Sequence, residues 1–203
     1  MKKVFLLSSV IFAVGFSGPK TDSLSPSERK FAVDYYNKTK DHLLSDIKGL
    51  SPEQLNFKAD SSRWSVAQCV EHIALAETAI WQWCQHMMQQ PATPEKRSEM
   101  KFTPEQVIQR MTDRSSKFKA PDAIQPSGKF PSTEAATQAF ISRRDSTITY
   151  IKMTQDDLKD HFIQHPVMGT LDLYEGLIII AAHSARHTLQ IEEVMANPNF
   201  PKH

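Results

Sequence analysis

Helix-start signals recur along this chain, and each is followed by apolar residues spaced three and four apart. In the first, Ser25 can cap the helix, Pro26 takes the first helical position and Glu28 completes a capping box. The apolar residues that follow recur at multiples of four: Phe31, Tyr35, Leu43 and Ile47. Since this spacing is that of an amphipathic helix, it predicts a helix that ends near Gly49.

Further helices are predicted from the same signals. Their ranges are 65–90, 103–117 (a shorter helix within a connection), 132–153 and 172–197. Residues 51–55 can make one turn. Asp172 is predicted to cap the last helix with Glu175 as its box partner. Residues 161–172 are predicted to be a loop, because Pro166 and Gly169 break any helix, and Pro166 favours extended geometry at His165.

These elements predict an all-α fold. Apolar and polar residues nowhere alternate over enough positions to build a sheet. Four long helices, joined by one elaborate and two moderate connections, predict a four-helix bundle of the antiparallel type. With 203 residues, of which 40% are hydrophobic, the chain is long enough for one domain, which we place at residues 19–203.

The N-terminus has the layout of a secretory signal peptide. Lys2 and Lys3 precede an apolar run from Val4 to Phe16, and small residues and Pro19 follow. We therefore expect residues 1–18 to be removed and the protein to be periplasmic or extracellular. An apolar N-terminus that stays on the chain is the alternative. The run of 13 residues is short of the roughly 20 that span a membrane, so the mature chain should have no membrane span.

Charge and cysteine content exclude some classes of function. The formal net charge is only +1 and the basic residues are interspersed, so nucleic acid is not an expected partner. Cys69 and Cys84 are the two cysteines, and on one continuous helix they would lie about 22 Å apart. They should therefore be unbridged core residues.

The chemistry of the chain is expected to lie in its histidines. His183 and His187 fall on a stripe of the last helix that begins and ends with apolar residues, so both should point inward. Two imidazoles one turn apart are a geometry that binds a divalent metal, although such pairs also arise by chance. His72 could supply a third ligand, because the small residues Cys69 and Ala76 leave room beside it. Its alternative role is that of a hydrogen-bonded core histidine.

Other polar residues are alternative candidates for the same chemistry. His161 and His165 form a competing pair, but Pro166 places them in a loop. Gln190, one turn after His187, could orient a water molecule or simply fill the helix interface. His42 and His86 have no obvious partners in the sequence.

Three segments carry a resemblance to a known family. They are "LSPEQLNFKADSSRWSVAQCVEHIALAE", "HPVMGTLDLYEGLI" and "AAHSARHTLQIEEV". In order and spacing they resemble the DinB-like superfamily of four-helix bundles, also called the DinB/YfiT-like fold, over most of residues 28–198. The resemblance implies a metal site made by His72, His183 and His187. Zinc or nickel would suit three imidazoles, which leave a position open for water or substrate.

The resemblance implies a metal-dependent enzyme, and a hydrolase acting on a small molecule is the favoured interpretation. Similar proteins include transferases that use low-molecular-weight thiols, but those thiols are cytoplasmic and the expected export argues against them. A non-catalytic binding module is the other alternative. Residues 176–182, "GLIIIAA", are apolar nearly all round the helix, which suits either deep burial or a homodimer interface.

Overall fold

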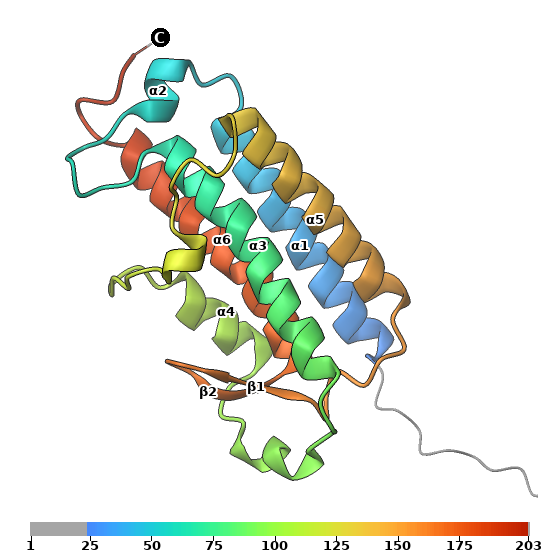
Figure 1. The fold of residues 1–203 in the computed structure, drawn as a ribbon. Helices are drawn as coiled ribbons and strands as arrows, with labels where there is room; N and C mark the ends of the chain where they lie inside the picture. The colour runs from blue at the N-terminus through green and yellow to red at the C-terminus, as the bar shows by residue number, and fades with distance from the viewer. Residues whose placement is uncertain (1–23, 203) are drawn as a thin grey trace, which may run out of the picture.

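The computed structural model describes residues 24–202, so the predicted signal peptide at residues 1–18 lies outside the described part (Figure 1). The elements, in chain order, are α1 (Pro26–Ile47), α2 (Pro52–Asn56), α3 (Val66–Met88), a 3₁₀ helix (Pro94–Glu99), α4 (Pro104–Thr112), a second 3₁₀ helix (Asp122–Ile124), α5 (Thr133–Met153), β1 (Phe162–His165), β2 (Gly169–Asp172) and α6 (Leu173–Met195). None of these helices is long and apolar enough to cross a membrane.

The helix starts form as the sequence predicts. At α1, α3 and α4, the side chains of Ser25, Ser65 and Thr103 each accept a hydrogen bond from the backbone N–H three residues on. In each case the residue at that third position returns a bond to the cap, so the capping box is complete. The four long helices α1, α3, α5 and α6 form the predicted bundle, and α4 packs along α6 (Figure 1).

The bundle is not of the antiparallel type that we predicted. One core cluster joins Leu43 and Val194, near the C-terminal ends of α1 and α6, to Val66 and Ala136, near the N-terminal ends of α3 and α5. Helices α1 and α6 therefore run parallel to each other and opposite to α3 and α5 (Figure 1). The physical reason is the connection between α3 and α5, which carries the chain back along the bundle before α5 begins.

Residues 161–172, predicted to be a loop, form a two-stranded antiparallel hairpin. Strands β1 and β2 pair from Phe162 opposite Asp172 to His165 opposite Gly169. His165 is extended, as expected, and its Nδ1 accepts hydrogen bonds from the backbone N–H groups of Val167 and Met168 across the turn. Each strand has only four residues, which is too short for an alternation that the sequence could reveal.

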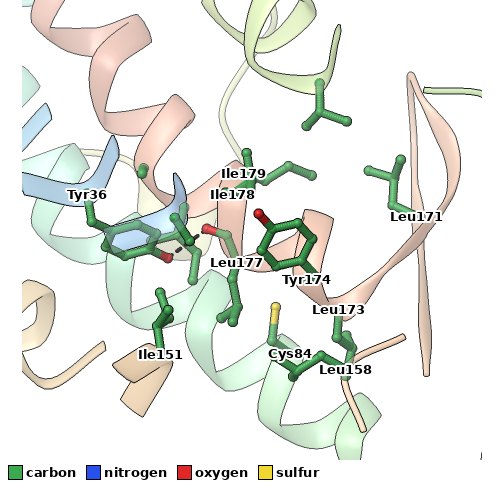
Figure 2. Close-up of a cluster of buried hydrophobic side chains, with 14 of the residues drawn as sticks. Tyr36, Cys84, Ile151, Leu158, Leu171, Leu173, Tyr174, Leu177, Ile178 and Ile179 are labelled. Carbon is green, nitrogen blue, oxygen red and sulfur yellow. Dashed lines mark hydrogen bonds between the residues drawn. The ribbon is translucent and has the colours of Figure 1, made fainter. Parts of the chain in front are cut away.

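The lower part of the core is built around the start of α6. Figure 2 shows Tyr36, Cys84, Tyr174 and Leu177 in this cluster, and the Tyr36 hydroxyl donates to the Leu177 carbonyl at 2.6 Å. Residues 176–182 are all buried within the bundle, which resolves the choice between burial and a dimer interface in favour of burial. Cys69 and Cys84 are buried and unbridged, as predicted.

A buried polar layer crosses the middle of the bundle. Arg144 of α5 is fully buried and pairs with Glu77 of α3 through Nε, at 3.2 Å, and through Nη2. Its other N–H groups donate to the Tyr36 carbonyl and the Thr39 hydroxyl of α1 and to the Ser184 hydroxyl of α6. All four long helices therefore meet at one guanidinium.

We predict that Arg144→Met destabilises the fold by about 3–5 kcal/mol, because it leaves the Glu77 carboxylate buried without its counter-charge. The double variant Arg144→Met/Glu77→Met removes both charges and should recover most of that loss. Urea unfolding at pH 7 measures both. A single variant that loses less than about 1 kcal/mol would contradict the prediction.

The start of α6 departs from the predicted capping box. Asp172 accepts from the Glu175 N–H at 2.8 Å, but the Glu175 side chain does not return a bond to Asp172. Asp172 also ends strand β2, so the helix starts directly from a strand and not from a free loop. The Glu175 carboxyl is buried instead, and its Oε2 has no hydrogen-bond partner. Burial, followed by the charge of Asp172, raises the pKa of Glu175 to about 8.

This raised pKa predicts a pH dependence of stability. Between pH 4.5 and about 8 the folded protein keeps a proton on Glu175 that the unfolded chain releases, so this group's contribution to stability falls as the pH rises. Glu175→Gln should therefore flatten the decline in unfolding free energy between pH 5 and pH 8. Glu95→Gln, which changes an exposed carboxylate, serves as the control. Equal pH profiles for wild type and Glu175→Gln would show the prediction to be wrong.

Candidate metal centre

The structure brings together the three histidines named from the sequence. His72 comes from α3, and His183 and His187 come from successive turns of α6, which packs against α3. The His72 Nε2 lies 3.3 Å from the His183 Nε2 and 3.1 Å from the His187 Nε2. One ligand nitrogen from each ring lies within 4.8 Å of the other two.

Hydrogen bonds set the tautomers of two of these rings. The His72 Nδ1 lies 2.8 Å from the carbonyl oxygen of Ile124, which can only accept, so Nδ1 carries the proton. The His187 Nδ1 likewise lies 2.9 Å from the amide oxygen of Gln190. In the neutral rings both Nε2 atoms are therefore unprotonated. Each carries a lone pair, although the two atoms lie only 3.1 Å apart. They cannot hydrogen-bond to each other, and a shared cation would relieve their repulsion.

Burial keeps these rings neutral. It is the largest cause of the lowered pKa at all three histidines. The pKa of His183 falls to about 3, since the charges of His72, Arg186 and His165 add to the effect of burial. Neutral imidazoles are the form that binds a metal.

The donor set fits a divalent metal ion. Ligands about 2.0 Å from a tetrahedral ion lie about 3.3 Å apart, close to the two Nε2 separations measured from His72. The three residues could hold an ion with little rearrangement, and no carboxylate among them would neutralise its charge.

The three histidines differ in exposure. His72 is 1% exposed and His187 is 9% exposed, whereas His183 keeps an intermediate exposure. The Trp64 indole packs over the other two rings, with centroid distances of 4.8 Å to His72 and 5.9 Å to His187. Of the three histidines, His183 is therefore the one whose residue surface is least covered.

Gln190 makes two side-chain contacts at the edge of the site. Its amide oxygen accepts from His187 and, at 3.4 Å, from Arg114, whose guanidinium also binds the Glu193 carboxylate. Gln190 thus orients a ring of the site. Arg114 lies beyond the end of α4, so sequence spacing could not reveal this contact.

Glu71, next to His72, has a role that sequence reasoning missed. Its carboxylate accepts three backbone hydrogen bonds, from the N–H groups of Ser127, Gly128 and Lys129, at distances of 3.1, 3.2 and 2.7 Å. The same loop carries the Ile124 carbonyl that orients His72. Glu71 therefore anchors the segment that positions a proposed metal ligand. The sequence indicates only that the Glu71 carboxylate lies on a helix face next to that of His72.

The remaining described histidines do not belong to this group of ligands. Among residues 24–202, His161 and His165 belong to no cluster of metal-ligand type, and both ring nitrogens of His161 contact backbone carbonyls. His42, for which the sequence showed no partner, meets Asp46 and Glu192. Glu192 is 150 residues away along the chain, which is why this contact was missed.

Comparisons with known proteins agree with this architecture. A profile of the DinB superfamily matches residues 35–191. The uncharacterized protein YuaE of Bacillus subtilis (strain 168) is 25% identical over 163 residues, which cover 80% of this chain and 96% of YuaE. The solved structure of YfiT from Bacillus subtilis aligns with a TM-score of 0.57 and 14% identity, over 86% of this chain and 89% of YfiT. YfiT is described as a probable metal-dependent hydrolase with an unusual four-helix bundle topology.

The anchoring role of Glu71 predicts an effect on metal affinity. Glu71→Gln replaces an acceptor oxygen with an amide N–H₂ that faces backbone N–H groups, so the loop and its Ile124 carbonyl should loosen. We expect zinc to bind about 10-fold more weakly, as is typical when a group behind a metal ligand is lost. Competition with a chelating dye measures the affinity, and the exposed Glu53→Gln is the control. An affinity within twofold of wild type, in a variant with an unchanged melting temperature, would contradict the prediction.

Proposed function

The chain belongs to the DinB superfamily, and we propose that it is a metal-dependent hydrolase of small molecules with His72, His183 and His187 as the metal ligands. The convergence of their ring nitrogens carries this proposal. The unprotonated Nε2 atoms of His72 and His187 are held only 3.1 Å apart. The similarity to YfiT, itself described as a probable metal-dependent hydrolase, supports it.

Zinc or nickel is the metal that we propose, because both accept a set of imidazole nitrogens. Bound there, the ion would act as a Lewis acid and would lower the pKa of a water molecule in its open position.

The residues around the site prepare it for this chemistry. The Ile124 carbonyl and the Gln190 amide hold His72 and His187 in the tautomer that presents Nε2. Trp64 covers these two rings and excludes water from that side. His183 is the most exposed of the three, so we propose that the substrate enters beside it.

We also propose that the protein is exported, on the strength of the N-terminal sequence pattern. Export would separate it from cytoplasmic low-molecular-weight thiols, and we therefore prefer hydrolysis to thiol transfer. A closed, non-catalytic metal site is the second candidate, favoured by the burial of His72 and His187.

Metal content is the first test of the proposed site. The mature chain is purified without a histidine tag or a chelator, beside His183→Ala/His187→Ala. The wild type should carry about one more equivalent of metal than the double variant, because the variant leaves a single imidazole at the site. His86→Ala, which changes an exposed histidine on the same helix as His72, should keep the metal. A wild type that also fails to bind added zinc or nickel would contradict the proposal.

Turnover separates an enzyme from a structural site. The metal-loaded protein is assayed against chromogenic carboxylic esters, amides and phosphate esters, and activity should be lost in the double variant and on chelation. Full metal occupancy without hydrolysis of any of these classes would favour the non-catalytic alternative.

A further inference from the structure

A second group of metal-ligand side chains lies at the far end of the bundle. His42 and Asp46 stand four residues apart on α1, so they share one face, and Glu192 reaches them from α6. The His42 Nε2 lies 2.7 Å from a Glu192 oxygen and 3.5 Å from the Asp46 Oδ2. One ligand atom from each residue lies within 4.8 Å of the others.

The charges of this group are unbalanced. Within residues 24–202, His42 is the ion-pair partner of both Asp46 and Glu192, so two carboxylates share one imidazole. The Asp46 Oδ2 is itself buried and has no hydrogen-bond partner. Burial raises the pKa of Asp46, and the Glu192 charge raises it further against the opposing effect of His42.

The helix ends add to the negative charge. Because α1 and α6 run parallel, their C-termini lie at the same end of the bundle (Figure 1). The carbonyl groups at a helix C-terminus carry partial negative charge, which a basic side chain in the last turn usually offsets. Neither helix has a basic residue in its last turn, and Lys48 is the C-cap residue that follows α1. Two carboxylates and two helix ends thus converge with one titratable histidine between them.

We propose that His42, Asp46 and Glu192 bind a second divalent cation of the zinc class, which links the C-terminal ends of α1 and α6. One imidazole nitrogen and two carboxylate oxygens are ligands that zinc accepts, and side-chain rotations can bring them to the spacing of about 3.3 Å that a tetrahedral ion requires. A divalent ion cancels both carboxylate charges, whereas a protonated His42 cancels only one.

This site differs from the histidine centre in access and in charge. The side chains of His42 and Glu192 are 41% and 42% exposed, so the ion would exchange readily and bind more weakly than at the buried histidines. Its charge would be neutralised by its own ligands, which suits a structural link and not catalysis. Because it uses none of the histidines of the first site, it can be tested with that site removed.

The experiment titrates zinc into His183→Ala/His187→Ala and follows both bound zinc and melting temperature. One equivalent should remain, and zinc should raise the melting temperature because it binds the folded state. Adding Glu192→Gln should weaken this binding at least 10-fold and abolish the thermal shift. Asp41→Asn removes an exposed carboxylate next to His42 that lies outside the group, and should leave the binding unchanged.

Two results would overturn the proposal. If the double variant binds no zinc, the group is only a histidine-carboxylate ion pair. If it binds zinc equally well with Glu192→Gln, the zinc lies elsewhere. Should the double variant fail to fold, the same comparison is made in the wild type, where Glu192→Gln should remove the second equivalent and leave the first.

Discussion

The buried guanidinium of Arg144 determines how the helices meet. Each of its N–H groups is used, and its partners come from α1, α3 and α6. Because removing such a charge from water is costly, we expect the complete network to add little net stability, whereas the loss of one partner should be strongly destabilising. Glu77 also accepts from the Ser184 hydroxyl at 2.6 Å, which sets the register of α3 against α6. His183 directly precedes Ser184, and His72 lies five residues before Glu77. The same register therefore places His72 opposite the two histidines of α6.

Because α3 and α5 run parallel, the connection between them has to cross the length of the bundle. To return to the end where α3 begins, the chain must pass along the bundle between residues 89 and 132, and it does so beside α3 and α6. This passage supplies the Ile124 carbonyl for His72 and the Arg114 guanidinium for Gln190. Glu71 then holds the end of the passage through three backbone N–H groups. The connection that makes the helix pairing parallel therefore also supplies the groups that surround the histidines.

Local signals made most of the helices predictable, whereas contacts between distant residues did not. The capping residues and the spacing of apolar side chains act within a few residues, so α1, α3, α4 and α5 begin at the predicted positions. The hairpin was missed because four-residue strands show too little alternation, and the parallel arrangement because it depends on the path of a loop. The three histidines could be named from helical periodicity and family resemblance. The contacts of Glu71 with the loop at residues 127–129, of Gln190 with Arg114 and of His42 with Glu192 join residues far apart in the sequence.

The two histidine groups show how the choice of ligands sets what a metal ion could do. At the buried centre, neutral imidazoles would leave the full double charge of an ion available to polarise a substrate or water. At the surface group, two carboxylates would neutralise the ion, and little charge would remain to act on a ligand. The buried centre also bears a cost without an ion, since lone pairs of His72 and His187 face each other at 3.1 Å. Packing elsewhere in the fold offsets this repulsion. The ligands are therefore already in position before an ion binds.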